Sequence, residues 1–275
     1  MVVPPRWPAE AIWEAVYPAL PDASVEILPE LDSTNTELMR RARAGRLEPV
    51  LLVAERQTAG RGRLGREWLS TAGDSLTFSL GIALSPPDWS GLSLAVGVSV
   101  AESLHKDLKL KWPNDLWLVG AGGDRKLGGI LIETASVGEQ RYAVIGVGIN
   151  VAARDGAGLA TPPACLHELD AGLDAPQALL RIAPALVQTV LAFGQFGFAP
   201  FQARFNARDA LRDRAVRVSD GHGGVLEGTA HGVGEDGALL VHTALGMKQI
   251  TSSEVSVRPQ ADAHWAAGAA SGKAA

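Results

Sequence analysis

The sequence predicts an α+β protein with a mixed or antiparallel central sheet, helices packed on one side of that sheet, and a small C-terminal β-barrel of SH3-like size. Three observations predict this fold. Short apolar segments between residues 109 and 147 are separated only by turn residues, which leaves no room for helical crossovers. Longer segments with helical periodicity flank them. From about residue 211 the chain changes to short strand-like segments between glycine turns.

The N-terminal part of the chain predicts two helices and two strands. Residues 7–20 carry apolar side chains at helical spacing, and a short strand is expected near Val25–Leu28. Asp32–Asn35 supplies side-chain oxygens that can cap a helix, and that helix is expected to end at Gly45. Val50–Glu55 is apolar nearly throughout and predicts a buried strand.

The central part of the chain predicts the rest of the sheet. Ser75–Leu84 alternates between apolar and other side chains, which is typical of a half-buried strand. Leu92–Leu104 is rich in small residues and predicts a helix packed on the sheet. Four more short strands are expected, at Lys109–Trp112, Leu116–Val119, Gly129–Glu133 and Tyr142–Val147.

Ala175–Gly194 is the longest segment with helical periodicity, and Asp174 is its expected cap. Pro184 lies inside it and is expected to kink the helix or to split it in two. A shorter helix is expected at Phe201–Ala207. The barrel strands are expected at Ala215–Val218, Val225–Val233, Ala238–His242, Lys248–Thr251 and Val255–Arg258.

Length and composition predict a large domain over residues 1–210, the barrel domain over residues 211–259 and a disordered tail over residues 260–275. The formal net charge of −5 argues against a dedicated nucleic-acid-binding protein. Cys165 is the single cysteine, which fits a reducing compartment. The N-terminus does not resemble a signal peptide, and no uninterrupted apolar stretch is long enough to span a bilayer. We therefore expect a cytoplasmic protein that does not bind membranes.

One segment, Gly60–Trp68, carries the strongest functional signal and is called the arginine loop below. It sets three arginines among three glycines, directly after an apolar strand. Glycine lets the backbone approach a ligand closely, and arginine presents forked donors that suit phosphate or carboxylate oxygens. Trp68 offers a flat surface for a ring. The loop therefore predicts a clamp for an anionic, ring-bearing small molecule such as a nucleotide, although a solvated turn would have a similar composition.

The same loop matches two known phosphate-binding patterns only in part or not at all. Gly60, Gly62 and Gly65 have the spacing of a dinucleotide-binding fingerprint. Such a site needs an acidic residue about 20 positions further on to hold the ribose, and residues 81–87 contain none. A Walker A loop is excluded because no Gly-Lys-Ser/Thr follows. These absences argue against a nicotinamide-dependent oxidoreductase and a P-loop enzyme.

Three further segments combine polar groups with glycine or proline. Lys111–Asp115 presents a cation, an amide and a carboxylate around a rigid Pro113, Lys126–Glu133 begins with a lysine and two glycines, and Gly146–Asn150 ends an apolar strand with alternating glycines and an amide. Each segment also has an ordinary structural explanation: a capped hairpin turn, a glycine bulge and strand packing, respectively.

Taken in order, four segments resemble the signature segments of the biotin protein ligases: Gly60–Trp68, Lys111–Asp115, Lys126–Glu133 and Gly146–Val151. Asp32–Asn35 and Gln57 resemble that family's remaining biotin-site elements, and the resemblance extends from about Leu28 to Arg258. It implies a class II synthetase-like catalytic domain followed by the small barrel. The family joins biotin to ATP as biotinyl-5′-AMP and then transfers biotin to one lysine of a carrier domain.

This resemblance implies roles for individual residues. The catalytic residues would be Arg63, Lys126 and Asp115, with Lys126 bridging the two reacting anions and Asp115 orienting or deprotonating the incoming lysine. Biotin would be bound by Ser33, Thr34, Asn35, Gln57, Gly60, Arg61, Gly62, Arg63, Lys126, Gly128, Gly129 and Gly148. ATP would be bound by Arg63, Arg66, Trp68, Lys111, Asn114, Ile130 and Asn150. Mg²⁺ is expected on the ATP phosphates, with no protein side chain as a metal ligand.

The resemblance also implies partners. The expected protein partner is a biotin carboxyl carrier protein, a subunit of acetyl-CoA carboxylase, and pairing as a homodimer is a property the family often has. Only about thirty residues precede Asp32, too few for a helix-turn-helix domain, so we expect a monofunctional ligase without operator binding. Two alternatives stay open: a lipoate- or octanoate-protein ligase or transferase of the related fold, and a binding module without catalysis.

Overall fold

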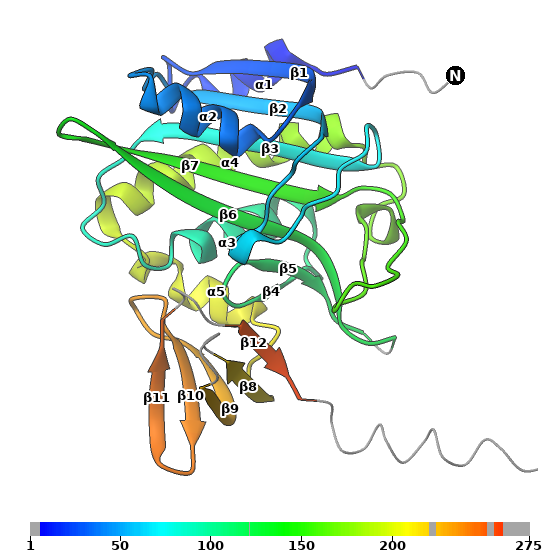
Figure 1. The fold of residues 1–275 in the computed structure, drawn as a ribbon, viewed down its shortest axis with the longest axis vertical. Coiled ribbons are helices and arrows are strands. Elements are labelled where there is room, and N and C mark those ends of the chain that lie inside the picture. The colour runs from blue at the N-terminus through cyan, green and yellow to red at the C-terminus, as the bar shows by residue number, and fades with distance from the viewer. Residues whose placement is uncertain (1–5, 121, 220–223, 252–255, 261–275) are drawn as a thin grey trace, which may run out of the picture.

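The computed structural model describes residues 6–120, 122–219, 224–251 and 256–260. The larger of two sheets contains β1 (Ser24–Leu31), β2 (Val50–Gln57), β3 (Ser75–Ala83), β4 (Lys109–Lys111), β5 (Asp115–Leu118), β6 (Arg125–Val137) and β7 (Gln140–Asn150). Its strands lie in the order β1-β2-β3-β7-β6-β5-β4 (Figure 1). The β1–β2 pair is parallel and each other neighbouring pair is antiparallel, which confirms a mixed sheet.

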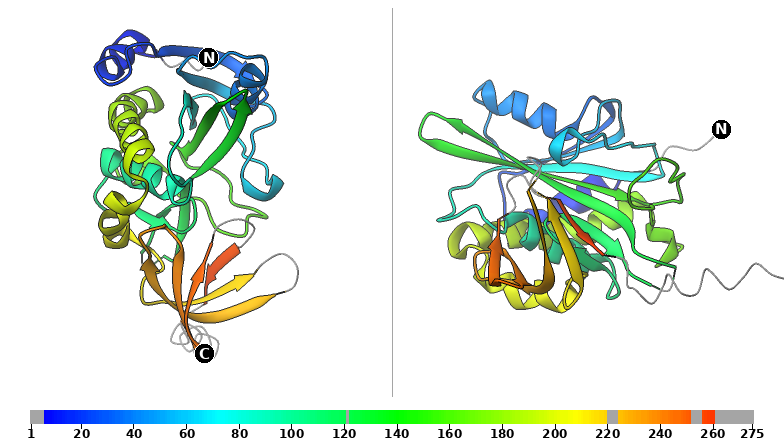
Figure 2. Two further views of the ribbon diagram at one scale, coloured as in Figure 1. Left: turned by 90° about the vertical axis from the view of Figure 1, so that its left-hand side faces the viewer. Right: turned by 60° about the horizontal axis from the view of Figure 1, so that its bottom comes forward.

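The helices in the described residues are α1 (Ala9–Val16), α2 (Thr34–Arg43), α3 (Leu92–Leu104), α4 (Ala175–Phe196) and α5 (Gln202–Arg208). Short 3-10 turns lie at Arg63–Gly65, Leu166–Glu168 and Ala199–Phe201. Helices α1, α3, α4 and α5 lie on one side of the sheet, whereas α2 lies on the other (Figure 2, left). The prediction that the helices share one side is therefore wrong for α2.

The alternation of β2 explains this arrangement. Leu51 and Val53 point into the main core, while Val50 and Leu52 point to the opposite face and pack near Leu38 of α2. Strands alternate their side chains between the two faces of a sheet. Because β2 is apolar at each of these positions, its sequence predicts burial but does not indicate that a helix covers each face separately.

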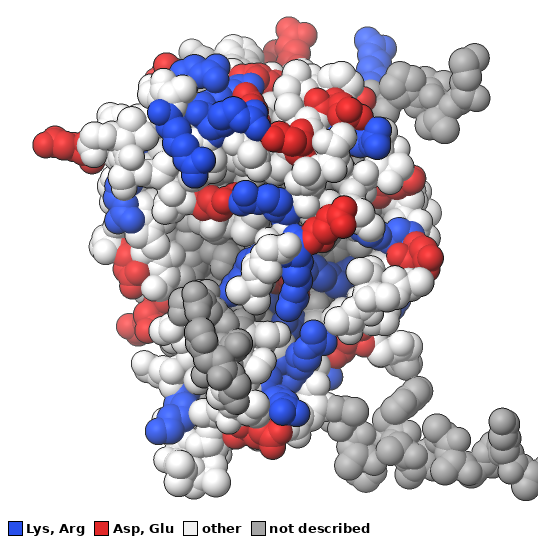
Figure 3. Space-filling model, in the orientation of Figure 1, with Lys and Arg blue, Asp and Glu red and all other residues white. Residues whose placement is uncertain are grey.

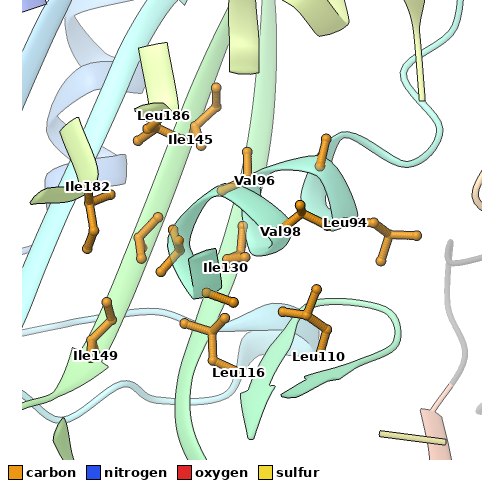
Figure 4. Close-up of a cluster of buried hydrophobic side chains, with 14 of the residues drawn as sticks. Leu94, Val96, Val98, Leu110, Leu116, Ile130, Ile145, Ile149, Ile182 and Leu186 are labelled. Atoms are coloured by element: carbon orange, nitrogen blue, oxygen red, sulfur yellow. The ribbon is translucent and has the colours of Figure 1, made fainter. Parts of the chain in front are cut away.

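The main core lies between the sheet and helices α3 and α4 (Figure 4). Most residues of α3 are buried, so this helix is apolar almost all round, as expected for a helix enclosed between other elements. Each fully buried aliphatic side chain of this kind contributes about 1.5–3 kcal/mol relative to an exposed one. The labelled members of the cluster are Leu94, Val96, Val98, Leu110, Leu116, Ile130, Ile145, Ile149, Ile182 and Leu186.

Two helix starts confirm predicted caps. The Ser33 hydroxyl accepts a hydrogen bond from the Thr36 amide (3.4 Å), and the Asp174 carboxylate accepts one from the Gln177 amide (2.8 Å). Helix α4 continues through Pro184 as one helix, so of the two predicted effects, a kink or a split, the split is wrong. Its packing against α1, α3 and β3 offsets the hydrogen bond that proline cannot donate. Although α4 is long and apolar enough to cross a bilayer, its apolar face is buried within this core.

The C-terminal strands form a second, antiparallel sheet. It contains β8 (Ala215–Ser219), β9 (Val225–Val233), β10 (Leu239–Thr243), β11 (Gly246–Ile250) and β12 (Ser256–Pro259), in the order β11-β10-β9-β8-β12. The described strands do not close into a barrel, since β11 and β12 are not paired with each other. Val255 and the tail over residues 261–275 lie outside the described residues.

The second sheet is joined to the first part of the chain near the Lys111–Asp115 segment. Buried Trp112 donates from Nε1 to the carbonyl oxygen of Gly237, at 3.0 Å. Arg214 forms an ion pair with Asp124, at 2.8 Å. Strand β12 lies near β4 and β5 of the large sheet (Figure 1).

Candidate functional site

A cavity of about 610 Å³ lies on the same face of the large sheet as α2. Its floor includes Gly146, Gly148 and Asn150, which follow Val144 at every second position of β7 and therefore share the α2 side of the sheet. The arginine loop lies across the cavity, and Lys and Arg side chains gather around the hollow in the middle of this face (Figure 3).

The structure brings nearly all predicted site residues to this one cavity. The predicted site residues that line it are Ser33, Thr34, Asn35, Gln57, Arg61, Gly62, Arg63, Arg66, Trp68, Lys111, Asn114, Asp115, Lys126, Gly129, Ile130, Gly148 and Asn150. Their individual roles stay predictions, but segments as distant as α2 and β7 converge here.

Gly60 and Gly128 were predicted to contact biotin and do not line the cavity. A Cβ atom on Gly60 would lie 2.2 Å from the carbonyl oxygen of Trp68, and one on Gly128 would lie 2.5 Å from that of Gly148. Both distances are far shorter than a van der Waals contact. These two glycines therefore permit close approach between protein backbones, in the loop and between β6 and β7.

One end of the cavity carries a buried polar cluster. The Gln57 side-chain oxygen accepts from the Thr34 amide at 2.8 Å and from the Thr34 hydroxyl at 3.2 Å. The Ser79 hydroxyl lies 2.7 Å from both the Thr34 hydroxyl and the side-chain oxygen of Asn35. Because buried polar groups are costly unless paired, this network holds the hydroxyl and amide groups in place to meet a polar ring.

Two lysines and one carboxylate lie toward the middle of the cavity. Lys126 Nζ is 2.7 Å from Asp115 Oδ1, and Lys111 Nζ is 3.8 Å from Asp115 Oδ2. Burial lowers the pKa of Lys111 to about 8, against the opposing effect of Asp115. Two cations that share one carboxylate leave a net positive charge, which suits an anionic ligand.

The arginine loop contributes two kinds of contact. Burial lowers the pKa of Arg63 below its usual value, whereas the negative charge of Asp115 acts to raise it. Arg61 pairs with Glu133 of β6, so its guanidinium is engaged by the sheet although the residue lines the cavity. The indole of Trp68 packs on Gly148, where a Cβ would lie 2.5 Å from the ring.

Trp68 Nε1 is buried and has no hydrogen-bond partner within the described part of the chain. A buried indole N–H normally finds an acceptor. Trp68 Nε1 lies on the side of the ring that packs on Gly148, where a Cβ would be 2.7 Å from it. Trp117, another lining residue, also has a buried Nε1 that lacks a partner among the described residues.

Asn114 and Asn150, the two amides predicted to bind ATP, donate hydrogen bonds to backbone carbonyl groups of β6. Asn114 Nδ2 donates to the carbonyl oxygen of Ile130 at 2.8 Å. Asn150 Nδ2 donates to the carbonyl oxygens of Lys126, at 3.3 Å, and Ala164, at 3.0 Å. Both amides therefore position β6 and Lys126, whatever direct contact they make with a ligand.

Sequence reasoning did not assign roles to Ser79, Glu133, Arg154 and Arg258. Arg154 and Arg258 line the cavity, while Ser79 and Glu133 bond to residues that do. The even spacing of Ser75, Thr77 and Ser79 on β3 was a usable signal, because polar groups recurring on one face of a buried strand need partners. Among the described residues, no group of three or more His, Cys, Asp or Glu side chains could hold a metal ion.

Comparison with known proteins agrees with this geometry. Residues 28–150 match the Biotin/lipoate A/B protein ligase family, and residues 213–258 match the Biotin protein ligase C terminal domain. The chain is 36% identical over 251 residues to the bifunctional ligase/repressor BirA of Escherichia coli K12, a similarity that covers 87% of this chain and 75% of that protein. It is 35% identical over 231 residues to the biotin–[acetyl-CoA-carboxylase] ligase of Mycobacterium tuberculosis, covering 79% and 82%.

The solved structure of biotin protein ligase from Aquifex aeolicus in complex with biotin and ATP has a TM-score of 0.72 to this chain at 30% identity. The similarity covers 86% of this chain and 99% of that one. The matched regions include both the large mixed sheet and the C-terminal antiparallel sheet. The chain therefore belongs to the biotin protein ligase family.

Proposed function

We propose that this protein activates biotin with ATP to form biotinyl-5′-AMP and transfers the biotin to a lysine of a biotin carboxyl carrier protein. One observation carries this proposal: a single cavity is lined both by the buried Thr34–Gln57 pair and by the Lys126–Asp115 pair, together with a loop that carries three arginines. A polar ring can be bound by the first pair while its carboxylate reaches the cations.

In the first half-reaction, a carboxylate oxygen of biotin bonds to the α-phosphorus of ATP, and the bond from that phosphorus to the bridging oxygen of pyrophosphate breaks. The two reactants are both anions and repel each other. Lys126 and Arg63 would neutralise this repulsion at the point of contact, with Lys111 and Arg66 near the phosphates. The residues act by positioning and charge stabilisation, so no protein nucleophile is needed.

In the second half-reaction, the amine of the carrier lysine attacks the acyl carbon of the mixed anhydride and AMP leaves. The amine must lose one proton overall. Asp115, already bonded to Lys126, is placed to orient that amine or to accept its proton. Asp115 is largely shielded from solvent, with 14% of its side chain exposed, and this supports the proposed role.

Magnesium belongs to this proposal as an ion carried by ATP. The described residues offer no cluster of side-chain ligands for a metal, and cationic side chains line the middle of the cavity. This donor set fits a metal held by phosphate oxygens. When bound, Mg²⁺ would neutralise charge on the pyrophosphate leaving group.

A lipoate- or octanoate-using enzyme of the related fold is the alternative. The match of residues 213–258 to the C-terminal domain of biotin protein ligases favours biotin. The purified protein should be incubated with ATP labelled at the α-phosphate and with either biotin or lipoate. Biotin-dependent formation of an acyl-adenylate and of pyrophosphate is the expected result. An adenylate that forms with lipoate but not with biotin would contradict the proposal, and no pyrophosphate release with either acid would indicate a binding module.

The finer expectations about architecture and setting are proposals of the same kind. Five short antiparallel strands support a C-terminal domain of SH3-like barrel type over residues 211–259. The net charge of −5 supports a ligase that does not bind operator DNA. A gel-shift assay that shows nanomolar, sequence-specific binding of DNA would contradict this. A buried free cysteine supports a cytoplasmic setting. Homodimer formation follows from family resemblance, and sedimentation with biotin and ATP tests it.

A further inference from the structure

Glu133, on β6, has both carboxylate oxygens engaged by residues of the cavity. One oxygen, Oε1, accepts a hydrogen bond from the guanidinium of Arg61 in the arginine loop. The other, Oε2, accepts one from Nδ2 of Asn35, at 2.9 Å. A carboxylate bound on both oxygens is fixed in orientation, and its bond to a guanidinium is of the stronger, charge-assisted kind.

From Asn35 the contacts continue into the buried polar cluster. The side-chain oxygen of Asn35 accepts from the Ser79 hydroxyl, which also lies 2.7 Å from the hydroxyl of Thr34. The side chain of Asn35 fills the space above Gly146, where a Cβ would lie 2.2 Å from its side-chain oxygen. An unbroken chain of hydrogen bonds therefore runs from the polar end of the cavity to Arg61.

The arginine loop is closed on itself. The Trp68 amide donates to the carbonyl oxygen of Gly60 at 2.9 Å, and the Gly62 amide donates to that of Arg66 at 2.7 Å. These bonds make the loop a small hairpin that can move as one unit. Arg61 is the first arginine of this hairpin, and its contact with Glu133 ties the hairpin to the central sheet.

We propose that Glu133 is a positioning residue that couples closure of the arginine loop to occupation of the polar end of the cavity. This inference rests on the proposed function, since the ligand at that end is taken to be biotin. A ring bonded to the Thr34 cluster restrains Asn35, Asn35 restrains Glu133, and Glu133 then holds Arg61. The closed loop covers the acyl-adenylate and keeps water away from it.

Three variants test this coupling. Glu133→Gln keeps an oxygen for Asn35 but turns an amide toward Arg61, where it cannot accept. Arg61→Gln removes the same ion pair by changing its partner in the loop. Because 48% of the Arg61 side chain is exposed, this change should leave the sheet intact. Glu139→Gln is the matched control, because Glu139 is exposed and lies at the tip of the same β6–β7 hairpin.

Trypsin provides the readout, since the loop contains its cleavage sites. Cleavage after Arg63 and Arg66, two sites that every variant keeps, is followed by mass spectrometry, without ligand and with biotin alone. We expect biotin to slow loop cleavage about tenfold in the wild type and in Glu139→Gln. In Glu133→Gln and Arg61→Gln, ligand-free cleavage should be several-fold faster and biotin should protect less than twofold, although calorimetry still detects biotin binding. In the double variant Glu133→Gln/Arg61→Gln, the loop should be cleaved no faster than in either single variant, because both changes remove the same contact.

Activity separates this role from general loss of structure. Glu133→Gln should release more free biotinyl-adenylate per carrier biotinylated, by about fivefold or more, while the rate of pyrophosphate release in the first half-reaction falls far less. The proposed coupling would be overturned if the loop of Glu133→Gln were cleaved at the same rate as that of Glu139→Gln. It would also be overturned if biotin protected the two variants equally. A wild-type protein that forms no biotinyl-adenylate would overturn the ligase proposal instead, because the ligand-free cleavage rates do not depend on that activity.

Discussion

Lys126 Nζ lies 2.7 Å from Oδ1 of Asp115, and 14% of the Asp115 side chain is exposed. The lysine is thus held at a fixed place in the cavity before any substrate binds. A positioned cation stabilises developing charge without reorganising during the reaction, which is the condition under which electrostatic catalysis is strongest.

Replacing Lys126 with alanine should reduce biotin-dependent pyrophosphate release by about 10²–10³-fold, because one pre-positioned charge is lost. The melting temperature should change little, since 30% of the Lys126 side chain is exposed. Lys106→Ala, at an exposed position outside the cavity, is the control. Pyrophosphate release at the wild-type rate in Lys126→Ala would show that the assigned role is wrong.

Lys111 should make ATP use sensitive to pH. Its pKa of about 8 means that its charge is present below that pH and lost above it. Loss of the charge weakens attraction for the phosphates, so kcat/KM for ATP should fall as pH rises through about 8, a parameter that reports groups of the free enzyme. Lys111→Arg stays charged throughout, and its profile should be flat between pH 7 and 9. Parallel profiles for the two proteins would exclude Lys111 as the titrating group.

Adjacent glycines on β6 should respond differently to alanine. In Gly128→Ala the new Cβ would meet a backbone oxygen of the neighbouring strand at 2.5 Å, so the free energy of unfolding should fall by about 1–3 kcal/mol. In Gly129→Ala it would meet the flexible end of Lys126 at 3.3 Å. That variant should keep its melting temperature and lose activity, because Lys126 is displaced. Thermal unfolding and pyrophosphate release, measured together, distinguish the two effects; a Gly128→Ala protein as stable as the wild type would contradict the packing explanation.

Asp209 should lower stability at neutral pH. Burial raises its pKa to about 6, and its Oδ2 has no hydrogen-bond partner in the described residues. Between about pH 4 and 6 the native protein therefore binds one proton that the unfolded chain has lost. The free energy of unfolding is highest, as far as this group is concerned, below about pH 4, and it falls as pH rises through 6. Asp209→Asn keeps an oxygen for the Leu211 amide, which donates to Asp209 at 2.9 Å.

The Asp209→Asn variant should thus melt at a higher temperature than the wild type at pH 7–8, with a difference that shrinks toward pH 4.5. Asp236→Asn serves as its control, because Asp236 makes the same turn contact, to the Ala238 amide, at an exposed position. A difference in melting temperature that is constant with pH would show that titration of Asp209 is not its cause.

The sequence predicted most elements because their signals are local. The Asp32–Asn35 and Asp174 caps mark the starts of α2 and α4, and both were confirmed. The β6–β7 hairpin is longer than predicted, since β6 extends over Arg125–Val137. Its outer half carries exposed side chains such as Thr134 and Ser136, so strand pairing continues there without a hydrophobic pattern to reveal it.

The composition of the site could be predicted, but its connections could not. Motifs identified the cationic and polar residues, because each motif is contiguous in the chain. Pairs such as Arg61 with Glu133, separated by 72 positions, form only when the loop folds over β6. The same limit applied to Arg258, which reaches the cavity from the second sheet. Long-range side-chain contacts depend on strand register and loop path, and neither is encoded in a local pattern.

Within residues 6–260 as far as they are described, α2 is the one helix on the second face of the large sheet. This arrangement separates two kinds of constraint on the chain. Helices α1, α3 and α4 and the face they cover hold the bulk of the hydrophobic interior, so changes there act mainly on folding. The opposite face, occupied in part by α2, is free to carry the reactive groups. New substrate preferences can accordingly arise in this enzyme by altering side chains on that open half of the sheet, with the interior left untouched.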